Sequence, residues 1–161
     1  MGKEEEFLGH IKQHRGILNK ICFAYSNSNE EFKDLYQEIM YQVWKSYGNF
    51  RGDSQMSTWL YKVALFTALA FLKKKPKQVH EDVEQTQLPA PEATSDERQE
   101  ILKNAMNLLP ETDKAVLLLY LEDHSYKEMA DILGISESNI GVKINRIKKK
   151  LKTLMVKENG T

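Results

Sequence analysis

The sequence predicts an all-α protein, with an N-terminal three-helix bundle, a flexible acidic linker and a C-terminal four-helix domain that contains a helix-turn-helix. Apolar residues recur three or four positions apart in residues 7–72 and 101–154, which is the spacing of amphipathic helices. The sequence shows no strand pattern, and an acidic stretch separates its two helical parts. Since 161 residues can form two small domains, we expect domains at 1–76 and 96–161 and a linker at 77–95.

Three helices are expected in the N-terminal domain. The first covers residues 7–25, Asn29 is a good N-cap for the second, and the third starts near Ser57 and stops before Pro76. The segment "GNFRGDS" between the second and third has the composition of a loop. The apolar faces of the first two helices are expected to bury Phe7, Leu8, Ile11, Leu18, Ile21, Cys22, Tyr25, Phe32, Leu35, Tyr36, Ile39, Met40, Val43, Trp44 and Tyr47.

The pattern changes in residues 77–95. This stretch has prolines, many acids and few large apolar residues, so it cannot bury enough surface to become ordered. We interpret it as a flexible acidic linker, although an irregular loop packed on a domain is an alternative.

Helix start and stop signals are clear in the C-terminal domain. Pro110 lies at a helix start, and Ser125 with Glu128 three residues later forms a capping box. Gly134 is the residue type favoured just after a helix, and Ser136 is expected to cap the last helix. A core stripe on that last helix is formed by Ile140, Ile144, Ile147, Leu151 and Leu154.

Composition excludes several classes of protein. The first residues are acidic with no signal-peptide core, and the apolar run at 63–72 is shorter than the ~20 residues of a membrane span. Cys22, the only cysteine, lies on the apolar side of its helix and is expected to act as a small hydrophobe. We therefore expect a protein of the reducing cytoplasm with no membrane insertion.

The last helix has a polar face that then becomes basic. Residues 135–161 contain seven Lys and Arg against two Asp and Glu. Short polar side chains at the start of such a helix can approach base edges in the major groove, and lysines further along can reach phosphates. A lysine-rich face that is merely solvated is the alternative. The residues expected to contact DNA are Ser136, Ser138, Asn139, Val142, Lys143, Asn145, Arg146, Lys149 and Lys150.

The order of motifs resembles a known family. "DLYQEIMYQVW", "FRGDSQMSTWLYKVAL", the acidic linker, "LLPETDKAVLLLYLEDHSYKEMADILGIS" and the basic last helix occur in the order seen in bacterial RNA polymerase sigma factors. The chain looks like the small extracytoplasmic-function (ECF) group over about residues 5–155. The resemblance implies that the first domain binds core RNA polymerase and the −10 promoter element, and that the second binds the −35 element. It also implies an anti-sigma factor as a possible partner.

Two sets of site residues follow from this resemblance. "DLYQE" matches the core-binding motif, whose polar stripe would be Asp34, Gln37, Glu38, Tyr41 and Lys45. Without the resemblance, ordinary solvated positions would be the simpler interpretation. The segment that captures the opened −10 strand would supply cations and stacking surfaces from Phe50, Arg51, Trp59, Tyr61 and Lys62. Trp59 is equally well explained as a core residue.

The chain departs from the family pattern at two places. Many family members have an asparagine that reads a −10 base where this chain has Phe66. We expect Phe66 to belong to the −10 surface and to act by shape and stacking, with burial in the core as the alternative. In the last helix, Asn139 and Gly141 replace small or β-branched residues of the commoner form. The preferred bases of both elements therefore cannot be carried over from the family.

Two other classes of function are less well supported. A helix-turn-helix regulator of the response-regulator output type would carry an α/β sensory domain, and residues 1–77 show no strand pattern. An enzyme would need a site, and the best metal candidates, His10 and His14, lack further ligands. We expect no catalytic residue, metal, cofactor or small-molecule substrate.

Overall fold

The computed structural model describes residues 2–52, 55–74 and 97–159, and these ranges contain eight helices and no strand. The prediction of an all-α fold is confirmed. The chain divides into two compact units, Met1–Leu88 and Pro89–Thr161, and each is described by itself. The linker predicted at 77–95 lies outside the described residues.

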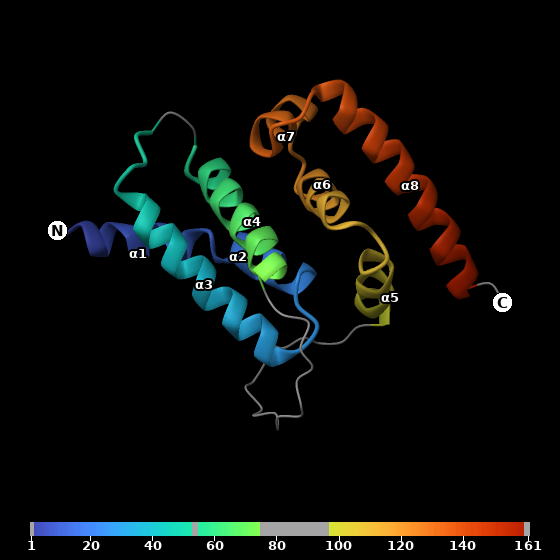
Figure 1. Cartoon of the computed structure of the whole chain (residues 1–161), viewed down its shortest axis with the longest axis horizontal. Coiled ribbons are helices and arrows are strands. Elements are labelled where there is room, and N and C mark those ends of the chain that lie inside the picture. Colours follow the sequence, from blue (N-terminus) through green and yellow to red (C-terminus); the bar gives the residue numbers. More distant parts are fainter. Residues whose placement is uncertain (1, 53–54, 75–96, 160–161) are drawn as a thin grey trace. The chain divides into compact units, whose positions relative to one another are not determined.

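The first unit contains α1 (Lys3–Gln13), α2 (Arg15–Ala24), α3 (Asn29–Tyr47) and α4 (Met56–Lys74). The long helices α3 and α4 pack against each other, and α2 packs against both (Figure 1). Their buried side chains repeat at helical spacing, and each fully buried Leu or Ile contributes about 1.5–3 kcal/mol. The centre of this core is formed by Leu18, Ile21, Cys22, Leu35, Ile39, Val43, Leu60, Ala64, Leu65 and Ala68.

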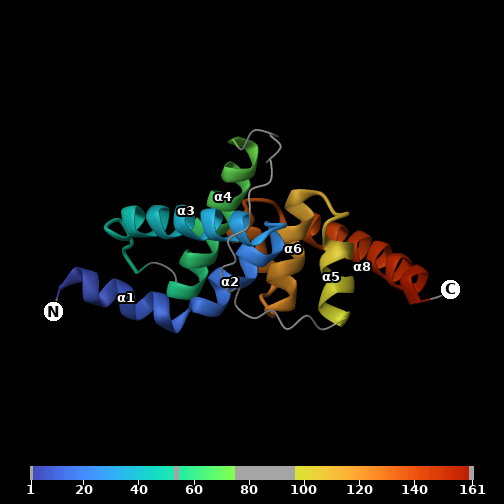
Figure 2. The same ribbon diagram turned by 90° about the horizontal axis from the view of Figure 1, so that it is seen from below.

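The first predicted helix is in fact two helices. The chain bends between α1 and α2 at His14 (Figure 2), whose N–H is shared by the carbonyls of His10 and Ile11, as is common at helix ends. Gly16, a weak helix former, lies two residues later in the first turn of α2. The cap of α3 also differs by one position from the prediction, because Ser28, and not Asn29, accepts a hydrogen bond from the N–H of Glu31 (3.1 Å).

Aromatic side chains join α1 to the end of α3 and the start of α4. The ring of Phe7 lies 4.9 Å from that of Trp44 and 5.3 Å from that of Tyr47. The ring of Trp59 lies 6.2 Å from that of Tyr47. Trp44 remains 41% exposed, so its predicted burial is wrong. Its ring lies at the edge of the cluster, under the ammonium group of Lys3 (5.7 Å). Leu8, also predicted to be buried, is 50% exposed.

The second unit contains α5 (Glu97–Met106), α6 (Glu111–Leu121), α7 (Tyr126–Leu133) and α8 (Glu137–Asn159). The long helix α8 packs against α5, α6 and α7 (Figure 1). Its stripe of Ile140, Ile144 and Ile147 is buried, as predicted. This core is completed by Ala105, Met106, Leu109, Ala115, Val116, Leu119, Met129 and Ile132.

None of the helices in the described ranges combines the length and the apolar character needed to cross a membrane. Among the same residues, no group of three or more His, Cys, Asp or Glu side chains is arranged to hold a metal ion.

Candidate nucleic-acid interface

The turn between α7 and α8 is fixed by local hydrogen bonds. The Ser125 hydroxyl and the Glu128 carboxylate cap α7 reciprocally, so the predicted capping box is confirmed. Gly134 ends α7 with φ of 74°, a conformation that glycine adopts without strain. Ser136 then accepts a hydrogen bond from the N–H of Asn139 at 3.0 Å, which confirms it as the cap of α8. These contacts set the direction in which α8 leaves the turn.

The outer face of α8 is open to solvent. Ser138, Val142, Asn145 and Lys149 are exposed and lie three or four residues apart, on the side of the helix opposite to its buried isoleucines. Val142 is 58% exposed. A face with short polar and apolar side chains followed by a lysine has the shape and chemistry of a surface that enters the major groove.

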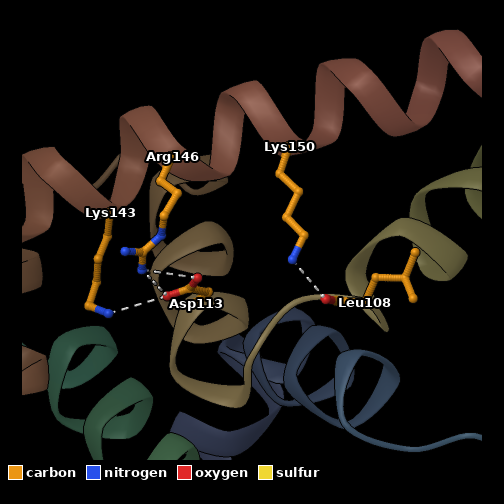
Figure 3. Close-up of polar contacts among 5 residues, drawn as sticks. All are labelled: Leu108, Asp113, Lys143, Arg146 and Lys150. Atoms are coloured by element: carbon orange, nitrogen blue, oxygen red, sulfur yellow. Dashed lines mark hydrogen bonds and ion pairs between the residues drawn. The ribbon is translucent and has the colours of Figure 1, made fainter.

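A second row of side chains lies on the flank of α8 that faces α6. Lys143 and Arg146 both bind the carboxylate of Asp113 on α6 (Figure 3). The Lys143 ammonium lies 3.3 Å from Oδ1, and Nη2 of Arg146 lies 3.4 Å from both oxygens. Further along, the Lys150 ammonium donates to the backbone carbonyl of Leu108 at 3.3 Å. Three of the nine predicted DNA-contact residues, Lys143, Arg146 and Lys150, are therefore bound by groups that lie before α7 in the chain.

Asp113, which pairs with two of these cations, is a residue that the sequence patterns did not predict at this surface. Its side chain is only 4% exposed, and a buried carboxylate needs charged or hydrogen-bonding partners. A signal was present in the sequence, because Asp113 lies three and four residues before Val116 and Leu117 and so shares their buried face. An acid on an apolar helix face indicates a cation on a neighbouring element.

The opposite flank of α8 carries another basic residue that the sequence analysis did not single out. The Lys148 ammonium lies 5.1 Å from the centre of the Tyr120 ring, and its interaction with that tyrosine raises the pKa of the lysine. Lys148 is thus positively charged and held over α6, beside the outer face of α8.

In the first unit, the residues expected at the −10 element do not all lie on one surface. The rings of Phe50 and Trp59 are 5.1 Å apart, and both are partly exposed. Lys62 and Phe66 are exposed one turn apart on α4, on the same side as Trp59. Phe66 is 44% exposed, so its ring is available to a partner.

Tyr61 points the other way. It is 1% exposed and lies in the core of the first unit, so its ring offers no face on which a base could stack. The expectation that Tyr61 contributes to this surface does not fit the structure, because Tyr61 belongs to the buried face of α4, whereas Lys62 and Phe66 lie on its exposed face. Arg51 is exposed in the loop before α4.

The predicted polar stripe on α3 is largely open. Asp34, Gln37, Tyr41 and Lys45 are exposed, and Lys45 lies over the ring of Tyr41 at 5.6 Å. Glu38 is half-buried and accepts a hydrogen bond from the Gln42 amide at 3.1 Å. The stripe thus presents acids, an amide and an aromatic ring beside one another.

Comparison with known proteins gives a consistent result. Residues 10–78 match the family model described as Sigma-70 region 2, and residues 99–151 match the one described as Sigma-70, region 4. The ECF RNA polymerase sigma-E factor of Haemophilus influenzae is 30% identical over 174 residues, which covers 96% of this chain and 92% of the relative. The sigma factor YlaC of Bacillus subtilis is 29% identical over 153 residues, which covers 89% of this chain and 88% of the relative.

Solved structures share the fold. The sigma factor RpoE from Bartonella quintana, solved in complex with the anti-sigma factor NepR, superposes with a TM-score of 0.72 at 18% identity, covering 94% of this chain and 97% of that one. CnrH, solved in complex with the cytosolic domain of CnrY, superposes with a TM-score of 0.71 at 17% identity, covering 96% of this chain and 90% of that one.

Proposed function

This chain belongs to the ECF group of bacterial RNA polymerase sigma factors, and from that premise we propose which of its surfaces meet the polymerase and the promoter. As a sigma factor, it binds core RNA polymerase and directs promoter-specific initiation of transcription. A response-regulator output protein is not favoured, because the region-2 match covers residues 10–78 as well.

The −35 element is bound by α8 and the turn before it. The observation that supports this most directly is the capped turn, which projects a solvent-exposed polar face from a helix whose other side is buried. The N-terminal half of that face lies at the bases, and Lys149 and Lys150 lie at phosphates. Ser136, at the start of α8, is also at the DNA.

The −10 strand is bound by the surface formed by Phe50, Arg51, Trp59, Lys62 and Phe66. Its two rings in contact and its exposed cations suit an unpaired strand, in which flipped bases stack on aromatic side chains and phosphates bind cations. Tyr61 supports this surface from the core and takes no part in binding.

Core polymerase binds the α3 stripe of Asp34, Gln37, Glu38, Tyr41 and Lys45. These residues lie three or four apart on one side of α3, where four of them are exposed and Glu38 is half-buried, and they offer a polar surface to a helix of the partner. We place the protein in the cytoplasm, where the polymerase is, and expect an anti-sigma factor, since both structural relatives were solved with a partner.

Reconstituted transcription tests the whole proposal. The purified chain is mixed with core RNA polymerase and a library of promoter fragments, and the transcripts are sequenced. We expect specific start sites that depend on this chain, with Lys149→Ala lowering the salt dependence of −35 binding by about one unit of slope. Transcripts that start at the same sites with and without the chain would refute a sigma function.

A further inference from the structure

The pairing of Lys143 and Arg146 with Asp113 divides the surface of α8 into two parts. Asp113 is buried on α6 and holds both cations on one flank of the helix. The outer face keeps Ser138, Val142 and Asn145 exposed. A residue on α6, outside the helix that enters the groove, thus decides which side chains of α8 are available to bases.

Withdrawal of either cation from Asp113 is unfavourable. The Asp113 side chain is 4% exposed. Removal of a cation from a buried carboxylate leaves its negative charge less well neutralised, which destabilises the fold. The side chain of Lys143 is 21% exposed and is itself partly buried at this contact. Arg146 is 56% exposed, so solvent and DNA phosphates can reach the part of its guanidinium that Asp113 does not bind.

The pairing of Arg146 with Asp113 affects which base pairs α8 can recognise. Arginine binding to guanine is the commonest specific contact in the major groove, and Arg146 is the only arginine of α8. With that guanidinium held at Asp113, the bases face Asn145, which suits adenine, and Val142, which suits the methyl group of thymine. The Ser138 hydroxyl can form a hydrogen bond with either kind of base pair.

We propose that Asp113 is a positioning residue for −35 recognition, which keeps Arg146 and Lys143 at the DNA backbone and leaves base reading to Ser138, Val142 and Asn145. The −35 element of this sigma factor is therefore read mainly at A·T pairs. This inference rests on the proposed function, and its test separates the two.

The experiment uses the full chain with core polymerase and a promoter library randomised at the −35 element. Four proteins are compared: the native chain, Arg146→Gln, Asp113→Asn, which keeps the size of the side chain but removes its charge, and the double variant. Asn145→Ala is the matched control on the base-reading face, and thermal melting shows that each variant is folded.

We expect the native profile to favour A·T pairs, and Asn145→Ala to weaken that preference by about tenfold at one position. Arg146→Gln should leave every base preference within about twofold and lower the salt slope by about one. Asp113→Asn should release Arg146 and create a guanine preference of about tenfold at one position, which the double variant loses.

Three results would overturn the inference while leaving the sigma function intact. These are a native preference for G·C pairs opposite α8, a base preference that Arg146→Gln alone abolishes, and an Asp113→Asn profile identical to the native one. Since Arg146 is exposed, its single substitution decides the question even if Asp113→Asn does not fold. Absence of any start site that depends on the native chain would instead refute the proposed function, and this inference with it.

Discussion

The backbone N–H of Ser125 donates a hydrogen bond to the carboxylate of Glu128 at 3.0 Å, and the backbone N–H of Glu128 donates one back to the Ser125 hydroxyl, also at 3.0 Å. This reciprocal pair fixes the first turn of α7, the helix that precedes the turn into α8. Because α7 has only eight residues, its ends matter more than those of a long helix.

Replacement of Ser125 by Ala should destabilise the C-terminal unit. The substitution removes the acceptor for the N–H of Glu128, and loss of an N-cap costs about 0.5–2 kcal/mol in the free energy of unfolding. Urea denaturation measures this cost. Ser138→Ala is the matched control, since Ser138 is exposed inside α8 and alanine favours the helix there. Equal stability of the two variants would contradict the capping role.

The same pair makes stability depend on pH. The hydrogen bond from the Ser125 N–H is the main cause that lowers the pKa of Glu128 below its ordinary value of 4.5. A carboxylate with a lowered folded-state pKa stabilises the fold fully above the unfolded value, and this contribution is lost as the pH falls through the folded value. When the pH is lowered through the acid range, the free energy of unfolding should therefore decline less in Glu128→Gln than in the native chain. Parallel curves for the two proteins would count against this.

Substitution of the α3 acids should weaken polymerase binding without unfolding the protein. Asp34→Ala combined with Glu38→Ala removes two charges from the proposed stripe. Asp34 is exposed, and the half-buried Glu38 loses one hydrogen bond from Gln42, which is worth about 0.5–1.5 kcal/mol. Titration with core polymerase measures the affinity. Glu4→Ala with Glu5→Ala removes two exposed charges from α1 and is the control. If both double variants bind alike, the stripe is not the polymerase contact.

Phe66→Asn should change the preferred −10 base while leaving thermal stability nearly intact. A half-exposed phenyl ring can stack on a base but cannot form the hydrogen bonds of an amide. Transcription from promoters varied at each −10 position measures the preference, and melting measures stability. Leu8→Asn, at a similarly exposed apolar residue of the same unit, should affect neither. A lower melting temperature with unchanged base preference would make Phe66 a structural residue.

Cys22 should react with thiol reagents only when the first unit opens. Burial raises the pKa of this thiol to about 12, and the thiolate is the reactive form. At about pH 8 only about one thiol in ten thousand is then ionised, so alkylation of the native chain should be much slower than in urea. Rapid modification without denaturant would mean that α2 opens readily.

Local patterns in the sequence were sufficient for much of the fold. The spacing of Ile140, Ile144 and Ile147 predicts the buried side of α8, and Ser125, Gly134 and Ser136 predict the turn before it. These features depend on hydrogen bonds and side-chain spacing within a few residues, so they can be recognised before the chain is folded. The break at His14 was not recognised, because both halves of the predicted helix keep an apolar stripe.

What only the tertiary structure decided is how these helices present their side chains. Phe66 and Trp44 have the apolar character of core residues, yet each lies where no neighbouring helix covers it fully. Arg146 has the chemistry of a base reader, yet it meets a carboxylate 33 residues earlier in the chain. Burial and ion pairing depend on which elements pack together, and a pattern confined to one helix carries no information about its neighbour. The sequence by itself determined the family and most of the helices, apart from the break at His14, whereas packing decided the availability of Arg146, Tyr61 and Phe66.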